Sequence, residues 1–119
     1  FASDENARRV NSIVHPAVRR DLQAWCRRHA SLPLVAVESA ILYESGFNVE
    51  VDRVLFVDAP PEVRIRRTIE RDGLRREQVV QRIQRQHPEE ACARADFRVV
   101  NDGKAPLDIQ LAALLETLI

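Results

Sequence analysis

The chain has 119 residues, a length that fits one domain or most of one and excludes a large multidomain protein. Its 18 basic and 18 acidic residues cancel and aromatic residues are scarce, a composition that argues against a nucleic-acid surface. Every basic residue except Lys104 is an arginine. Guanidinium groups bind phosphate and carboxylate in a planar fork, so a polyanionic small molecule is a possible ligand. A general preference of the source organism for arginine explains the bias equally well.

Two cysteines, Cys26 and Cys92, are too few and too far apart for a zinc site or a disulfide framework. We therefore expect reduced thiols and a cytoplasmic protein. No run of residues approaches the roughly 20 apolar residues of a membrane span, and the sequence does not open on a charged-then-apolar signal pattern. The sequence therefore predicts no membrane association.

The first predicted element is a helix over Ser3–Val14, with Ser3 as its N-cap. Proline disfavours helical geometry in the residue before it and suits the first turn of a helix. The sequence therefore predicts a break at His15 and a second helix from Pro16. Apolar spacing predicts that this second helix buries a continuous stripe formed by Val18, Leu22, Trp25, Cys26 and His29.

Three short apolar runs without alternation predict strands that are buried on both faces, at Leu34–Val37, Val54–Val57 and Phe97–Val100. A short helix is expected at Ser39–Tyr43. Longer helices are expected at Pro61–Arg71, at Arg75–Arg85 and over the leucines at 107, 111, 114, 115 and 118. Strands alternating with helices predict a parallel α/β sheet with flanking helices. Three strands make a thin sheet, which suggests that further strands belong to it.

The densest functional signal is a run of arginines on the two helices before and after Asp72-Gly73. Arg64, Arg67 and Arg71 share one helical face, and the next helix carries Arg75, Arg82 and Arg85. A mobile arginine-rich lid of this kind could stabilise the charge of a transferred phosphoryl group and exclude water. The alternative is a solvated helical surface on which these arginines pair with Glu62, Glu70 and Glu77.

Other candidates are single residues, each with a structural alternative. Glu38 follows a predicted strand and could orient magnesium through water or meet a substrate, or it could simply precede a helix; Glu44 carries the same ambiguity. His15 could contact a substrate phosphate or make a structural hydrogen bond. Asn101-Asp102-Gly103 could contact a nucleobase or form a plain turn. His29 and His87 lack metal-ligand spacing, and no metal site is predicted.

The sequence has no phosphate-binding motif of the form Gly-x-x-x-x-Gly-Lys-Ser/Thr. Gly103-Lys104 has the right dipeptide, but Arg98 stands at the first glycine and Ala105 at the hydroxyl position. These 119 residues therefore contain no cradle for nucleotide phosphates of that type.

Taken together, six segments of the chain resemble the dephospho-coenzyme A kinase family in their order and approximate spacing. The Glu-Ser-Ala-Ile-Leu-Tyr-Glu-Ser-Gly-Phe stretch that begins at Glu38 is similar to the version found in Bacteroidetes, whereas the more common family form has a proline near Ala40. The resemblance covers nearly the whole chain and rests on Val10–Pro16, Val37–Gly46, Arg53–Asp58, Arg66–Asp72, Arg82–Gln86 and Ala95–Gly103.

This resemblance implies a partial P-loop NTPase fold of the adenylate-kinase type. It also implies transfer of the γ-phosphate of ATP, with Mg²⁺, to the 3′-hydroxyl of dephospho-coenzyme A, the last step of coenzyme A synthesis. Residues 1–32 would be a helical substrate-binding region and residues 62–95 a lid within a single partial domain. By motif, the lid would use Arg66, Arg67, Arg71, Arg82 and Arg85; ATP would meet Gln86, Asn101 and Gly103; and the substrate would meet His15, Glu38 and Glu44.

The resemblance further implies that the phosphate-binding loop, the catalytic base and a central strand lie upstream of Phe1. We therefore expect the 119 residues to be inactive alone. We also expect a sheet with open edges, which could self-associate, exchange strands, or collapse so that Leu34–Val37 pairs with Val54–Val57. The alternative functions are another nucleotide or nucleoside kinase of this fold, or a non-catalytic α/β binding module.

Overall fold

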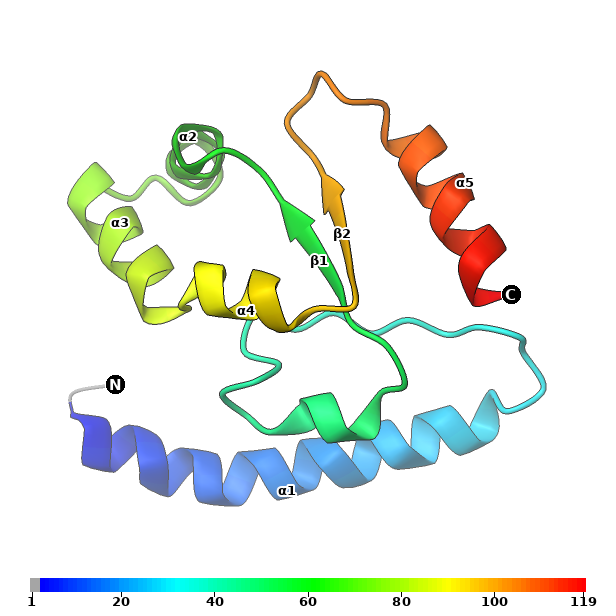
Figure 1. The fold of residues 1–119 in the computed structure, drawn as a ribbon. Coiled ribbons are helices and arrows are strands. Elements are labelled where there is room, and N and C mark those ends of the chain that lie inside the picture. The colour runs from blue at the N-terminus through cyan, green and yellow to red at the C-terminus, as the bar shows by residue number, and fades with distance from the viewer. Residues whose placement is uncertain (1–2) are drawn as a thin grey trace. The chain divides into compact units, whose positions relative to one another are not determined.

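The computed structural model describes residues 3–119, which form two compact units that divide between Glu50 and Val51 (Figure 1). The first unit contains one long helix and a short 3-10 helix. The second contains a two-stranded sheet and four helices. The elements in chain order are α1 (Asp4–Arg28), η1 (Phe47–Glu50), β1 (Leu55–Asp58), α2 (Pro61–Asp72), α3 (Arg76–Arg85), α4 (Pro88–Arg94), β2 (Phe97–Val100) and α5 (Leu107–Leu118).

Helix α1 begins where the sequence predicts. The Asn6 amide donates to the Ser3 hydroxyl at 3.1 Å, which satisfies one of the free N–H groups at the helix start. Acidic residues lie in the first turn and Arg27 and Arg28 in the last, the arrangement that the helix dipole favours. The predicted N-cap is confirmed.

The predicted break at Pro16 is wrong, because α1 runs through this proline without interruption. Proline has no N–H to donate, so the carbonyl four residues earlier, on Ser12, loses its helical partner. This part of α1 is open to water, since Ile13 is 74% exposed. Water can therefore solvate the free carbonyl, and the helix continues. The predicted buried stripe is also not found, because α1 has no fully buried residue and Val18 is exposed.

The predicted strand Leu34–Val37 is also wrong. Its residues are exposed and irregular, and residues 40–46 form turns in place of the predicted helix. An apolar parallel strand is stable when neighbouring strands satisfy its backbone and other layers cover both of its faces. Among residues 3–119 this segment has no strand partner. Glu38 accordingly follows an irregular segment, and pairing of 34–37 with 54–57 is absent.

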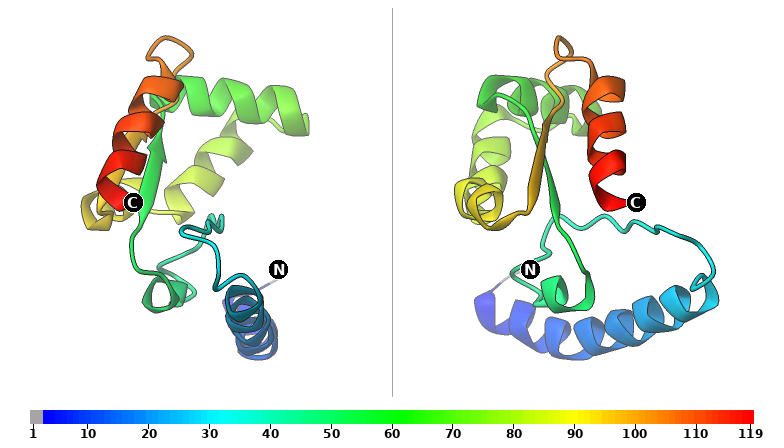
Figure 2. Two further views of the ribbon diagram at one scale, coloured as in Figure 1. Left: turned by 90° about the vertical axis from the view of Figure 1, so that its right-hand side faces the viewer. Right: turned by 45° about the vertical axis from the view of Figure 1, so that its right-hand side comes forward.

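In the second unit, β1 and β2 pair in parallel, with Leu55 opposite Phe97 and Asp58 opposite Val100. The chain crosses from β1 to β2 through α2, α3 and α4, which lie on one side of the sheet, while α5 lies on the other (Figure 2). These two predicted strands and the predicted α/β class are confirmed. Helix α4 was not predicted.

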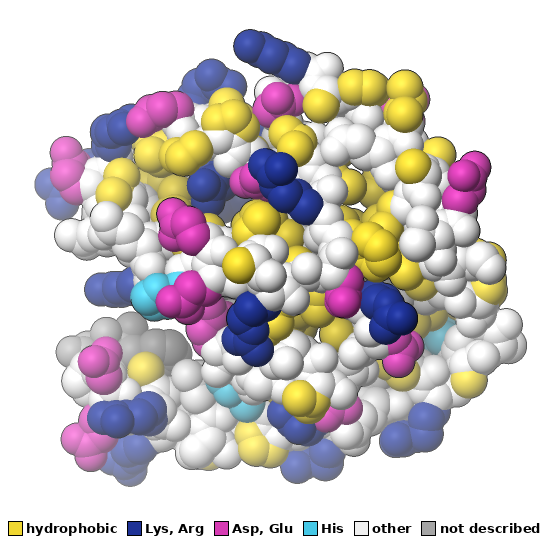
Figure 3. Space-filling model, viewed as in Figure 1, with side chains coloured by type: hydrophobic (Ala, Val, Ile, Leu, Met, Phe, Trp, Pro, Cys, Tyr) yellow, Lys and Arg dark blue, Asp and Glu magenta, His cyan; other side chains and the backbone are white. Residues whose placement is uncertain are grey.

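The apolar core of the second unit is small. Its buried residues are Ala59, Ile65, Val79 and Val99. On the α5 side of the sheet, Val99 of β2 is buried, but Val57 beside it on β1 is 57% exposed. Figure 3 shows apolar side chains open to view around the sheet and α5. Helix α5 therefore covers β2 and leaves β1 largely uncovered, and no second strand borders β1 within the part of the chain that the structure describes.

Within residues 3–119, no helix is both long and apolar enough to cross a membrane.

Candidate functional site

The two arginine-bearing helices are joined at a glycine that the backbone requires. Helix α2 is capped after Asp72 by Gly73, whose φ of 66° is left-handed and whose amide donates to the Ile69 carbonyl at 2.9 Å. A side chain is strained in this conformation, so glycine is the favoured residue at this helix end. The turn directs α3 back beside α2, which brings charged groups from the two helices together.

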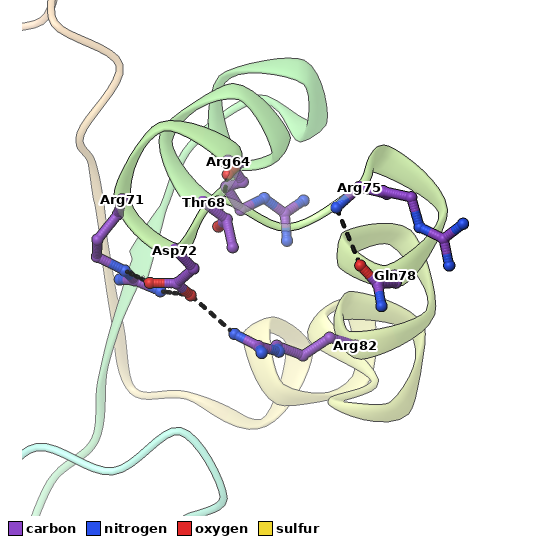
Figure 4. A network of polar contacts seen from close by, with 7 residues as sticks. All are labelled: Arg64, Thr68, Arg71, Asp72, Arg75, Gln78 and Arg82. Carbon is purple, nitrogen blue, oxygen red and sulfur yellow. Dashed lines mark hydrogen bonds and ion pairs between the residues drawn. The ribbon is translucent and has the colours of Figure 1, made fainter.

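One carboxylate lies at the centre of the arginine cluster (Figure 4). Asp72 accepts hydrogen bonds from Arg71 Nε at 2.8 Å and Arg71 Nη2 at 3.1 Å, and a third from Arg82 Nη1 at 3.0 Å. The hydrogen bonds from Arg71, followed by the one from Arg82, lower the pKa of Asp72 to about 2. Two of the predicted lid arginines therefore bind the same anionic group.

A second ion pair joins α2 and α3 near their first turns. Arg76 donates from Nη2 and Nη1 to the two carboxylate oxygens of Glu62, at 2.7 and 3.0 Å. This bidentate contact lowers the pKa of Glu62. Glu62 therefore pairs between helices, whereas the alternative of a solvated surface had paired it within one helix.

Arg67 connects the arginine helices to the predicted adenine loop. Its Nη1 donates to the Asn101 carbonyl at 2.6 Å, and its Nη2 lies 3.9 Å from the position that a Cβ on Gly103 would occupy. Asp102 closes the loop by accepting from the amides of Lys104 and Ala105, each at 2.9 Å, which lowers the pKa of Asp102. The structure thus brings together predicted residues that are 34 positions apart in sequence.

The remaining arginine candidates lie at the surface. Arg66 and Arg85 are exposed, and neither side chain makes a hydrogen bond or ion pair within residues 3–119. Gln86 is half-buried at the end of α3. Arg64 instead donates from Nε to the Ala59 carbonyl at 2.9 Å and so supports the start of its own helix. Arg66 and Arg85 are therefore available to an external anion.

In the first unit, His15 packs edge-on against buried Phe47, with 5.7 Å between ring centroids. Arg19 lies over the same ring at 5.5 Å and pairs with Glu50 at 3.1 Å, and Gln23 also donates to Glu50 at 3.1 Å. Sequence reasoning missed Arg19 and Gln23. The signal was present, because 15, 19 and 23 recur every four residues and share one face of a helix.

The two predicted acidic substrate residues do not join this cluster. Glu38 and Glu44 are both exposed, and neither side chain makes a hydrogen bond or ion pair within residues 3–119. In the described part of the chain, no group of three or more His, Cys, Asp or Glu residues is placed to hold a metal ion. The structure therefore brings His15, but neither glutamate, into a defined side-chain arrangement.

An open hollow of about 610 Å³ lies at the carboxyl ends of the two strands, with apolar walls that include Phe56, Pro61 and Val100. Across it Arg98 Nε donates to Asp58 Oδ2 at 2.8 Å, which raises the pKa of Arg98. Sequence reasoning considered Arg98 only as a mismatch to the phosphate-binding motif. The strand register explains the contact, because Asp58 and Arg98 lie on one face of neighbouring strands.

The low pKa of Asp72 predicts how its ion pairs respond to acid. Its folded value of about 2 lies below the ordinary 3.8, so the contribution to stability is complete above about pH 4 and is lost as the pH falls towards 2. A carboxyl-carbon NMR titration should give a midpoint near 2. Arg71→Gln should raise that midpoint more than Arg82→Gln, because Arg71 is the larger cause. A midpoint near 3.8 in the unaltered chain would show that these ion pairs do not persist in solution.

Comparisons with known proteins match nearly the whole chain to one family. The model of the dephospho-CoA kinase family matches residues 1–106. The dephospho-CoA kinase of Bacteroides fragilis (strain YCH46) is 44% identical over 116 residues, which cover 97% of this chain and 57% of that protein. The dephospho-CoA kinase of Porphyromonas gingivalis is 40% identical over 119 residues and is covered to 58%.

A solved structure agrees with these matches. The crystal structure of TT1252 from Thermus thermophilus is similar with a TM-score of 0.80 and 35% identity, over 99% of this chain and 61% of that one. The chain thus spans a little over half the length of the curated relatives that it matches. Because the family model covers most of its residues, the chain belongs to the dephospho-CoA kinase family.

Proposed function

We propose that the protein to which these residues belong transfers the γ-phosphate of ATP to the 3′-hydroxyl of dephospho-coenzyme A. The observation that carries the proposal, beside family membership, is the bond from Arg67 to the Asn101 carbonyl. This bond places an arginine-bearing helix against the loop that is expected to meet adenine. The positive charge that would bind the phosphates therefore lies next to the loop that would bind the adenine base.

In this proposal the lid arginines stabilise the transferred phosphoryl group. Phosphoryl transfer has little covalent chemistry for the protein to perform, so positioning and positive charge supply most of the catalysis. Arg66 and Arg85 have no partner to exchange within the described residues, and Arg71 and Arg82 exchange one carboxylate for phosphate oxygens. The turn at Gly73 is the natural hinge for closing these helices over the nucleotide.

The nucleotide base is assigned to the loop Asn101–Gly103 and to Gln86 at the end of α3. Dephospho-coenzyme A is assigned to the helical substrate-binding region within residues 1–32, which includes His15, and to Glu38 and Glu44, which follow it. His15 is the best supported of these, because Phe47 fixes its ring in place. Both assignments follow the family resemblance.

Mg²⁺ is proposed to enter with ATP. This ion keeps several waters and binds phosphate oxygens with only one or two carboxylates, so a nucleotide can bring it to the site. When bound, it neutralises charge on the phosphates. We also place the protein in the cytoplasm, where Cys26 and Cys92 would stay reduced.

Replacing Arg67 in the whole enzyme tests the assignment of the nucleotide site. Arg67→Ala should raise the KM for ATP about tenfold, since it removes a charged hydrogen bond, and change the KM for dephospho-coenzyme A much less. Arg53→Ala is the matched control, because Arg53 is exposed and bonds only to the neighbouring Asp52 carbonyl. Equal effects of Arg67→Ala on both KM values would argue against a nucleotide site at this loop.

The 119 residues alone should not transfer phosphate, because they contain no glycine-rich phosphate-binding loop. A coupled assay of ADP release with ATP, Mg²⁺ and dephospho-coenzyme A should stay at background, while the whole enzyme turns over. Formation of coenzyme A by these residues alone would refute this expectation.

We further propose that the isolated chain self-associates through the open edge of β1. Unpaired strand edges recruit further strands. The free edge of β1 also has an exposed apolar side chain, Val57, beside it. Light scattering should show a mass that grows with concentration, and Val57→Lys should shift it towards the monomer. A monomer at every concentration would contradict the proposal.

A further inference from the structure

The Asp72 carboxylate occupies its arginines in the way that an oxygen anion from a ligand would. Arg71 presents two N–H groups and Arg82 a third, all directed at the two oxygens of one side chain (Figure 4). Guanidinium forks bind phosphate and carboxylate through the same planar geometry. The two arginines come from different helices, so the anion between them also links α2 to α3.

We propose that Asp72 is an internal stand-in for phosphate, which holds Arg71 and Arg82 together until a triphosphate displaces it. The inference rests on the proposed function and adds to it a residue that competes with the ligand for the lid. Asp72 is the last residue of α2 and precedes the left-handed Gly73. A displaced Asp72 therefore frees the helix link at the hinge itself, and binding is coupled to movement of α3.

The exposure of the three side chains makes this exchange feasible. Arg71 is 71% exposed and Arg82 50%, whereas Asp72 is only 27% exposed between them. A ligand can therefore reach both arginines from solvent. Exposed ion pairs of one charge are weak, while a triphosphate carries several charges. A single carboxylate is thus strong enough to order the site and weak enough to be displaced.

The other ion pair between the same helices gives a matched control. Glu62 and Arg76 make a bidentate contact of similar length near the first turns of α2 and α3. Glu62→Gln and Asp72→Asn each remove one negative charge and one link between these helices. They differ in which arginines they release.

The test is a titration of the chain with inorganic tripolyphosphate without magnesium, followed by the NMR signals of the arginine Nε–H groups. In Asp72→Asn, the Arg71 and Arg82 signals should report tripolyphosphate binding about two- to fivefold tighter than in Glu62→Gln. The reason is that tripolyphosphate no longer competes with the Asp72 carboxylate for these two arginines. Adding Arg82→Gln to Asp72→Asn should abolish this gain in affinity, because it removes one of the two arginines that Asp72→Asn releases. In the unaltered chain the carboxyl-carbon signal of Asp72 should move as tripolyphosphate binds, which provides a reading if Asp72→Asn fails to fold.

Three results would overturn the inference. Equal tightening in both variants would mean a general effect of charge, weaker binding in Asp72→Asn would mean a structural link only, and an unmoved Asp72 signal would mean no exchange. Titration of the whole enzyme with ATP separates the proposed function: perturbation of the Asn101 and Gly103 amides tests the nucleotide loop independently of Asp72. Failure at the loop with exchange intact would therefore reject the nucleotide assignment alone.

Discussion

The hydrogen bond from the Arg67 guanidinium to the Asn101 carbonyl is the contact on which the arrangement of the site depends. It joins helix α2, which follows β1, to the loop that follows β2. Because β1 and β2 are parallel and in register, their carboxyl ends lie side by side, and segments that leave them can meet. A donor of Arg67 then satisfies a carbonyl that the strand ladder leaves free. The Arg67 side chain thus fixes the position of the loop relative to α2.

Polar contacts of this kind matter here because the apolar core is small. The second unit buries Ala59, Ile65, Val79 and Val99, and its sheet has only two strands. Helix α3 buries Val79 and is linked to α2 by two ion pairs, Glu62–Arg76 and Asp72–Arg82. Exposed ion pairs contribute little stability individually, so the angle between these helices is open to change by a ligand of opposite charge. The proposed lid would need this property, since its closure would have to be driven by binding.

Local patterns predicted the elements whose stability is local or whose partners are present. The apolar runs at β1 and β2 pair with each other, and Ser3 caps α1 through its own side chain, so the sequence was sufficient for both. Leu34–Val37 has the same composition but lacks a neighbouring strand in the described residues, and it stays irregular. Pro16 was misread because its effect depends on whether the freed carbonyl is solvated, and solvation is a property of the folded surface.

The site divides in the same way. Helical spacing was enough to group the arginines of α2 and α3, and to suggest a hinge at Gly73. It could not show that Arg67 meets Asn101, because that contact spans two strands and has no periodicity. Nor could it distinguish Asp72 from the other acidic residues of these helices. Asp72 becomes distinct only when the turn brings Arg82 back onto it.

The folded arginine cluster therefore contains three kinds of arginine, and their difference has a consequence for binding. Arg64 and Arg67 donate to backbone carbonyls and are fixed as parts of the scaffold. Arg71 and Arg82 share a carboxylate, while Arg66 and Arg85 have no partner within the described residues. A polyanion can use the unpartnered pair without breaking any contact, but it must exchange with Asp72 to reach the shared pair. In the proposed lid, the helices would therefore rearrange only for a ligand with enough charge to complete the exchange with Asp72.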